Sequence, residues 1–451
     1  MYEDSVSLLK TNDCDFFDIY KEKSYTRIIE AKNGKVETVK MGIDSGVGVR
    51  IVKGLSTLYS SSYDAGDKSV YKLSKFLTDL NKPLQNVERV QSLPEKSILS
   101  YGEYKPELDK IKEIYDIFYS EGKKHNEIEQ VSLTYSDKAK HTSIINEEEK
   151  QFNESRTYTV LFVEITAKSN NIIQTARKPF GALGGFEFLK NINFKDIAPN
   201  MIEKLLELIK SPSLKASNMS VVLSSEAGGT MIHEAVGHGL EADLVYESMS
   251  VYKDKLNTKV ANEKITVVDD STKDFMRGSF YYDDEGTASE NTTLIENGIL
   301  KNYMFDKMYA NLARKVSTGN SRRESFRFSP IVRMSNTYIL PGKDNPDDII
   351  ASVDNGLFVK HMGGGQVNPV TGDFVFEVNE GYIIKNGKVK NMVQGATLIG
   401  NGPKILQEID MVGSDFGTEV GTCGKGSQGV PVTDGEPTLR IPNIMVGGSA
   451  L

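Results

Sequence analysis

Two histidines and a glutamate lie close together in the segment TMIHEAVGHGLEAD (230–243). His233 and His238 offer imidazole nitrogens, which zinc binds in their neutral form, and Glu234 directly follows the first of them. A carboxylate beside a zinc ligand can take a proton from the water that attacks a substrate. These residue types are typical of metal-dependent hydrolases, although such histidines are also common as hydrogen-bonded core residues.

The spacing of the two histidines is unusual for one metal site. They are five residues apart, whereas the familiar zinc-protease helix places them four apart on one face. Five residues of a regular α-helix turn about 140° beyond one full turn, so the two rings would point apart. Because Gly237 and Gly239 flank His238 and permit irregular backbone, we expect the helix to break or widen there.

A third metal ligand is needed, and the sequence offers Cys423, His361, Glu241 and Asp243. Cys423 lies in GTCGKGSQG, which is predicted to be a glycine-rich loop without apolar periodicity. A structural cysteine more often lies in a strand or helix among apolar neighbours, and Lys425 would favour the thiolate form of Cys423. His361 precedes a run of three glycines. Composition favours Cys423 over His361 only slightly, and Glu241 is more typical of a solvated helix charge than of a ligand.

The elements that must position these residues fall into two parts. The first part mixes helix and strand patterns, and Asn33-Gly34 supplies the positive φ angles of a hairpin turn. Apolar residues at helical spacing predict helices over about 67–81, 106–119 and 198–210. The stretch Ser211-Pro212-Ser213 disfavours helix, and it predicts the end of an N-terminal α+β domain covering residues 1–210.

The second part, residues 218–451, is richer in glycine and in strand patterns. Asn297-Gly298 and Asn386-Gly387 predict two further hairpins. Strands are expected near 220–223, 264–269, 336–340, 373–378 and 438–446, and helices near 230–245, 305–315, 346–353 and 402–409. The pattern favours a mostly β domain that carries the helix with the two histidines, and the whole chain is therefore expected to be α+β.

Composition excludes several other classes of protein. Two cysteines cannot form a disulfide framework or a multi-cysteine zinc module, and they favour a reducing, intracellular compartment. The charge of −8, from 54 Lys+Arg and 62 Asp+Glu, argues against direct nucleic-acid binding. The segment MYEDSVSLLK does not look like a secretory signal, and no apolar run approaches a membrane span. We expect a cytoplasmic protein without membrane contact.

Several long segments together resemble the TldD/PmbA family of metalloproteases. They are HEAVGHGLEAD, GNSRRESF, MSNTYILPGK, GGGQVNPVTGDFVF, GATLIGNG and GTCGKGSQGVPV. The resemblance covers essentially the whole chain and is densest after residue 218, while DSGVGVRIVKG is its best match in the N-terminal third. One departure is Ser321, where the family usually has glycine before the paired arginines.

The resemblance implies a site and an assembly. It implies one zinc per chain held by His233, His238 and Cys423, with Glu234 as general base. Because the other family branch, PmbA or TldE, lacks these ligands, the chain looks TldD-like. The resemblance also implies dimers, either of this chain with itself or with a metal-free PmbA/TldE-like paralogue, that enclose a cavity in which unfolded peptides bind as extended strands.

Substrate contacts are harder to assign. Gly363, Gly364, Gly365 and Gln366, together with the strand FVFEV that follows, are candidate edges for an added peptide strand, although a glycine bend between two core strands explains them equally well. Arg322 and Arg323 are candidate donors to substrate or to an oxyanion. A solvated arginine pair, or a salt bridge to Glu324, is the more ordinary interpretation of these two residues.

Two other function classes remain open on the sequence. Family names mention modulation of DNA gyrase, so the chain could be a non-catalytic adaptor with a structural metal. It could also be a metal hydrolase that acts on a non-peptide substrate. The acidic charge argues only against a version of the adaptor that contacts DNA directly.

Overall fold

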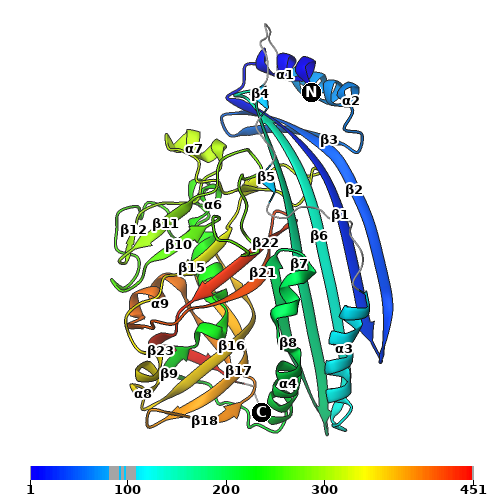
Figure 1. The fold of residues 1–451 in the computed structure, drawn as a ribbon. Coiled ribbons are helices and arrows are strands. Elements are labelled where there is room, and N and C mark those ends of the chain that lie inside the picture. The colour runs from blue at the N-terminus through cyan, green and yellow to red at the C-terminus, as the bar shows by residue number, and fades with distance from the viewer. Residues whose placement is uncertain (1, 81–90, 93–95, 98–107, 449–451) are drawn as a thin grey trace.

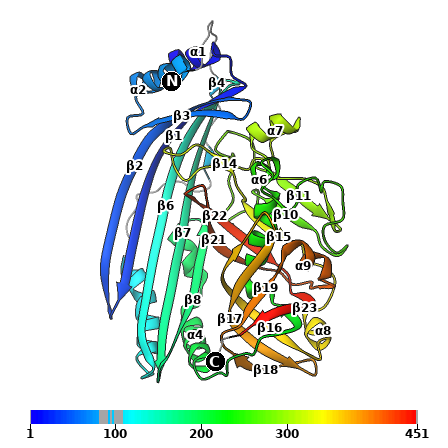
Figure 2. The same cartoon turned by 180° about the vertical axis from the view of Figure 1, so that it is seen from behind.

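The computed structural model describes residues 2–80, 91–92, 96–97 and 108–448. One long sheet stands along one side of the molecule, and the later strands form a second body beside it (Figure 1). The view from behind shows the same two layers (Figure 2). The predicted α+β fold is confirmed, and Asn81 and Pro106, which the predicted helices included, lie outside the described residues.

The first sheet has the strand order β3-β2-β1-β6-β7, with β8, β4 and β5 also pairing β7. Its long strands are β1 (Phe16–Lys32), β2 (Lys35–Lys53), β6 (Ile128–Asn146), β7 (Lys150–Ser169) and β8 (Ile172–Leu183). The short ones are β3 (Ser56–Ser62), β4 (Gln91–Ser92) and β5 (Lys96–Ser97). Helices α1 (Glu3–Lys10) and α2 (Asp67–Leu80) pack together at one end of this sheet.

Two further helices cover one face of the sheet. Apolar residues of α3 (Leu108–Gly122) and α4 (Phe194–Leu208), such as Phe118 and Leu205, pack in one cluster with Ile29, Leu133 and Leu161 of the strands. Each of these side chains is almost completely buried, which contributes about 2 kcal/mol per side chain by the hydrophobic effect. The apolar residues whose spacing predicted α3 and α4 are therefore residues that these helices bury against the sheet.

The rest of the chain forms two larger sheets and the pair β13 (Ser321–Arg322) and β14 (Ile331–Val332). One sheet contains β10 (Val267–Asp270), β11 (Asn291–Glu296), β12 (Ile299–Leu300), β15 (Asn336–Ile339), β21 (Gly417–Lys425) and β22 (Gln428–Glu436). The other contains β9 (Ser217–Leu223), β16 (Asn355–Val367), β17 (Asp373–Lys385), β18 (Lys388–Val393), β19 (Thr397–Asn401), β20 (Met411–Val412) and β23 (Leu439–Gly447).

Short helices interrupt these strands near the predicted positions. They are α5 (Thr230–Ile232), α6 (Ala242–Tyr246), α7 (Lys307–Ala313), α8 (Pro346–Ala351) and α9 (Gly402–Glu408). The three predicted Asn-Gly turns all have positive φ at both residues and join β1 to β2, β11 to β12 and β17 to β18. The hydrophobic core of this second body includes Met231, Ile232 and Val236, so the segment with the two histidines crosses its centre.

A buried network of charges joins the first sheet to the later loops. Asp18 on β1 accepts from Arg323 Nη2 at 2.9 Å and from Arg50 Nε at 2.5 Å. Arg50 also bonds Glu285, and the backbone N–H of Arg323 donates to Asp284. Burial opposes ionisation of Asp18, but Arg50 and Arg323 outweigh it and lower the pKa of that carboxyl below its usual value.

Removal of Arg323 should therefore destabilise the whole fold. Arg323→Met leaves the buried Asp18 carboxylate with one partner fewer and removes the donor to the backbone carbonyl oxygen of Asp284. This should lower the free energy of unfolding by about 3 kcal/mol. Arg327→Met is the matched control, because Arg327 pairs with Asp44 at the surface and should cost about 1 kcal/mol or less. Urea unfolding measures both, and equal losses would contradict the role given to Arg323.

Asp306 provides a pH-dependent test of the same region. It caps α7 by accepting the Tyr309 N–H, and burial, followed by the nearby Glu285, raises the pKa of Asp306 to about 7. The folded protein holds the proton of this carboxyl more tightly than the unfolded chain does, whose pKa is near 4. The stability linked to this group is therefore complete below about pH 4 and is lost as the pH rises to 7. Asp306→Asn keeps the cap without the charge, so at pH 8 it should be more stable than wild type by about 1 kcal/mol. Urea unfolding at pH 4 and pH 8 measures the difference, which should become small at pH 4.

Candidate metal centre

The segment with the two histidines is not a regular α-helix. It begins as α5, continues as a π-helical turn, η3 (His233–Gly237), and ends as a 3₁₀ turn, η4 (His238–Leu240). The N–H of His238 donates to the carbonyl of His233, which is the i→i+5 bond of a π-helix. The expectation that the helix widens near His238 is confirmed, and the widening brings the two histidines to the same side of the segment, one turn apart.

Close packing explains why glycines stand at this segment. A Cβ at Gly237 would lie 2.1 Å from Met334 Sδ. Met334 lies in the loop before β15, and the π-helical turn also contacts β15 itself. Gly229 precedes α5 with a φ of 74°, and a Cβ there would lie 2.4 Å from the backbone nitrogen of Gly435 on β22. Neither position has room for a side chain, and Gly229 also needs backbone that other residues rarely adopt.

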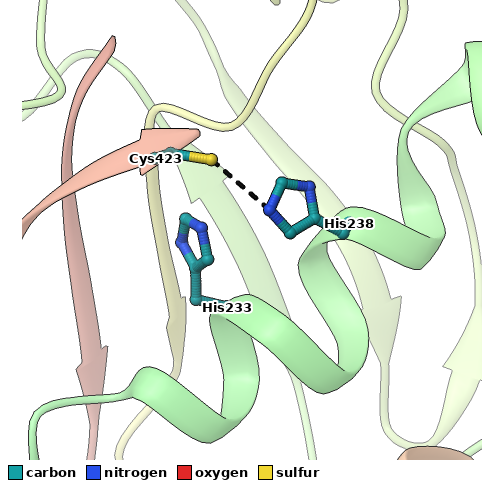
Figure 3. A group of neighbouring side chains, drawn as sticks. All are labelled: His233, His238 and Cys423. Atoms are coloured by element: carbon teal, nitrogen blue, oxygen red, sulfur yellow. Dashed lines mark hydrogen bonds between the residues drawn. The ribbon is translucent and has the colours of Figure 1, made fainter. Parts of the chain in front are cut away.

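Cys423 lies on strand β21 and packs in the hydrophobic core, so the prediction of a loop is wrong, and this strand brings Cys423 to the two histidines. One ligand atom from each of His233, His238 and Cys423 lies within 4.8 Å of the other two. Cys423 Sγ is 3.4 Å from His238 Nε2, and the two imidazole rings are perpendicular with centroids 5.1 Å apart (Figure 3). His361, the rival third ligand, lies elsewhere, with Nδ1 2.8 Å from the Glu226 carbonyl oxygen.

A carboxylate holds the other ring nitrogen of each histidine. His233 Nδ1 lies 2.7 Å from Asp434 Oδ1, and His238 Nδ1 lies 2.9 Å from Glu241 Oε2. When the rings are neutral, these bonds place the proton on Nδ1 and leave the Nε2 lone pair of each ring to bind a metal ion. Carboxylates bonded in this way orient metal-binding histidines and raise their basicity, so the donor set fits a tetrahedral zinc ion with one open position.

The pKa values of the two histidines and of Cys423 are strongly shifted. Burial would lower the pKa of His238, but Glu241 and Cys423 raise it to about 10, and Asp434 and Cys423 likewise raise the pKa of His233 well above its usual value despite burial. Burial would raise the pKa of Cys423, but its bonds to the two histidines lower it to about 6. A metal ion that binds here must displace protons from the histidines, so its binding is coupled to proton release.

Lys425 and Glu241 differ from their predicted environments. Lys425 does not face Cys423: its ammonium group bonds Glu241 and Asp243. The interpretation of Glu241 as a solvated helix charge is wrong, because its side chain is fully buried. Burial opposes its charge, but Lys425 and then His238 lower the pKa of Glu241 to about 2.

The arginine pair is buried in protein contacts. Arg322 donates to the carbonyl oxygens of Met334 and Pro431, each at 2.6 Å, and Arg323 bonds Asp18 as described above. Both side chains are about 2% exposed, so the interpretation as a solvated pair, or as a pair with Glu324, is wrong. Because both guanidinium groups are buried among protein groups, they are poor candidates for substrate or oxyanion binding.

The two segments predicted as edges for an added peptide strand differ in their pairing and exposure. The stretch 374–378 of β17 pairs with β16 on one side and β19 on the other, so the expectation that it offers a free edge is wrong. Gly364, Gly365 and Gln366 are exposed and Gly363 is partly exposed. This end of β16 pairs with β17.

Glu234 is partly exposed in the turn that also holds the buried His233.

Three residues near the cluster were not predicted from the sequence. Asp434 holds His233, Arg333 donates to the carbonyl oxygen of Cys423, and Arg277 donates to Gly421 and Thr422 on the same strand. All three lie far from their partners in the chain. The one signal for Asp434 was a charged residue within the otherwise mostly uncharged strand QGVPVTDGE.

Comparison with known proteins relates this chain to one family of metallopeptidases. The chain matches the model of the PmbA/TldA metallopeptidase C-terminal domain over residues 216–448 and that of domain 1 of the same family over residues 17–75. It is 34% identical to a metalloprotease TldD homolog from Buchnera aphidicola subsp. Schizaphis graminum, over 97% of this chain and 94% of the relative. A metalloprotease from Methanocaldococcus jannaschii is also 34% identical, over 94% of this chain and 96% of the relative.

Solved structures share the fold at lower identity. A Thermotoga maritima protein described as a candidate modulator of a DNA gyrase has a TM-score of 0.77 at 17% identity, with 96% of each chain covered. TldE from Thermococcus kodakarensis has a TM-score of 0.72 at 18% identity, covering 96% of this chain and 97% of the other. At these identities the two structures establish the fold alone.

The fold, the histidine segment and these similarities define a metallopeptidase class of protein. The chain belongs to the TldD/PmbA family, as its motifs indicated. No helix in the described part of the chain is long and apolar enough to cross a membrane.

The close packing around Gly229 yields a test of the site. Gly229→Ala places a Cβ against Gly435 and forces a strained φ, so it should lower the free energy of unfolding by about 2 kcal/mol. It should also shift Asp434 relative to His233 and weaken zinc binding about tenfold. Gly424→Ala is the control, since a Cβ there meets no atom within 4 Å. Urea unfolding and zinc competition titrations measure both effects, and a neutral Gly229→Ala would contradict the packing argument.

Proposed function

We propose that this protein is a zinc-dependent metallopeptidase of the TldD-like branch, with one zinc per chain held by His233, His238 and Cys423. The observation that carries the proposal is the convergence of two imidazoles and a thiol within 4.8 Å, with Glu234 next to His233 in the chain. A relative named as a zinc metalloprotease TldD homolog, from Saccharolobus solfataricus, is 28% identical over 91% of each chain and supports the choice of zinc.

In the proposed reaction Glu234 is the general base. A zinc ion in this site would supply Lewis acidity to the scissile carbonyl group. Glu234 takes a proton from the attacking water and later delivers it to the leaving amine, as its position beside His233 permits. Asp434 and Glu241 keep the two rings oriented, and Cys423 contributes a negative charge that reduces the Lewis acidity of the site.

The proposed substrates are unfolded or extended peptides. A cavity of about 690 Å³ is lined on β21 by residues 417–420, on the same strand as Cys423, but its lining includes neither the three candidate ligands nor Glu234. Its other walls come from β8, α4, β16 and β17. The exposed segment 363–366 is a candidate contact for the peptide backbone, whereas the buried Arg322 and Arg323 are not proposed as donors.

The proposed assembly is a dimer, either of two copies or of this chain with a metal-free TldE-like paralogue. The similarity of the fold to TldE supports the second arrangement. The division into domains 1–210 and 218–451 also remains a proposal. Neither cysteine forms a disulfide, which supports placement in the reducing cytoplasm.

Paired substitutions test the proposed chemistry. Glu234→Ala should keep zinc and lose peptidase activity on unfolded peptides by a factor of about 10² to 10⁴. Cys423→Ala should lose zinc while the fold survives, and Cys14→Ala, which alters the other cysteine, should change neither. Metal analysis together with digestion of a peptide library measures these outcomes.

The adaptor alternative predicts a different pattern. A non-catalytic protein with a structural metal would bind zinc and cleave no member of the peptide library, and Glu234→Ala would have no cellular effect. If Glu234→Ala cleaves unfolded peptides as fast as wild type, the proposed mechanism is wrong. A metal hydrolase with a non-peptide substrate would bind zinc and leave the whole library intact, yet would need Glu234.

A further inference from the structure

The three candidate ligands come from two segments that are far apart in the sequence. His238 and Cys423 are 185 residues apart, and one lies in a 3₁₀ turn while the other lies on β21. A metal site tolerates errors of only a few tenths of an ångström in ligand position. Some contact must therefore fix the histidine segment against this strand when no metal is bound.

Lys425 makes such a contact. It follows Cys423 by two residues on β21, so the two side chains leave the strand on the same face. Its Nζ lies 2.9 Å from Glu241 Oε2, 2.7 and 2.6 Å from the two oxygens of Asp243, and 3.0 Å from the carbonyl oxygen of Val332. Only 15% of the Lys425 side chain is exposed, so water screens these bonds little.

One carboxylate oxygen connects Lys425 to the histidine. Glu241 Oε2 accepts from Lys425 Nζ and also from His238 Nδ1, each at 2.9 Å. The second oxygen of Glu241 has no hydrogen-bond partner among the described residues, and the side chain is fully buried. Among the described residues, Lys425 and His238 are therefore the hydrogen-bond donors that position this carboxylate, and the carboxylate in turn positions the His238 ring.

We propose that Lys425 is a positioning residue for the metal site, which acts through Glu241 to set His238 against Cys423. It does not touch substrate or metal. Its ammonium group fixes the Glu241 carboxylate relative to β21, and that carboxylate fixes the imidazole whose Nε2 faces Cys423 Sγ. The inference rests on the proposed function only in requiring that the three residues bind a metal.

The alternative is that Lys425 is an ordinary buried ion pair whose loss affects stability alone. The two roles predict different effects on the free energy of unfolding and on zinc affinity. A stabilising pair would change the free energy of unfolding and leave the intrinsic zinc affinity of folded protein intact. A positioning residue that acts through Glu241 should change zinc affinity, and it should lose that effect when Glu241 no longer carries a charge.

The test is a double-substitution cycle on the full-length protein, with Lys425→Met, Glu241→Gln and the two combined. Zinc affinity is measured by competition with a chromophoric chelator, and folding of the metal-free protein by circular dichroism and urea unfolding. Cobalt(II) substitution adds a spectroscopic readout, because thiolate-to-cobalt charge transfer reports a correctly placed Cys423. Lys404→Met, which alters a surface lysine with a weak pair to Glu408, is the control.

Lys425→Met should weaken zinc binding 10- to 100-fold and reduce the cobalt–thiolate absorption, while Lys404→Met should change neither. In the Glu241→Gln background, Lys425→Met should cause little further loss. Unchanged zinc affinity in folded Lys425→Met overturns the proposal, as does an equal loss in both backgrounds. If Lys425→Met does not fold, Glu241→Gln alone serves in its place, because unchanged zinc affinity in folded Glu241→Gln also overturns the proposal. Wild-type protein that binds zinc but cleaves no peptide would overturn the proposed function and leave the role of Lys425 standing.

Discussion

The candidate site depends on one irregular feature, the i→i+5 hydrogen bond between the backbones of His233 and His238. An α-helical turn at this point would send the second ring away from the first, and Cys423 could then meet only one of them. The wider turn is held from outside, by Met334 against Gly237 and by Gly435 against Gly229. Packing in the core thus imposes a backbone shape that local helix propensity alone would not choose.

A second constraint is electrostatic. Two imidazoles and a thiol are surrounded by Asp434, Glu241 and Asp243, which are all largely buried, and Lys425 is the cation that bonds two of these carboxylates. Buried carboxylates are costly unless they are paired. Here they bond ring N–H groups and one ammonium group, so the charge that orients the histidines also attracts a divalent cation.

Local patterns predicted much of the fold, and they failed where distant segments meet. The Asn-Gly turns, the helices α3 and α4 and the widened turn at His238 follow from short-range rules on φ angles, apolar spacing and glycine. The pairing of His233 with Asp434, and the burial of Glu241 and Arg323, depend on contacts between segments far apart in the chain, or on which side of a helix meets a sheet. Choosing Cys423 over His361 needed the family resemblance, because both stand in glycine-rich segments of similar character.

The N-terminal sheet contributes none of the three candidate ligands, yet it is linked to them through neighbouring arginines. Arg323 bonds Asp18 on β1, while the adjacent Arg322 bonds the carbonyl oxygen of Met334, whose side chain packs against Gly237 in the π-helical turn. Both guanidinium groups are buried, and the two arginines are consecutive at the end of the short strand β13, so a shift of the first sheet must move that strand or break its bonds. The long sheet is therefore a rigid support for the turn that holds the histidines, and the geometry of the site depends on residues at both ends of this linkage.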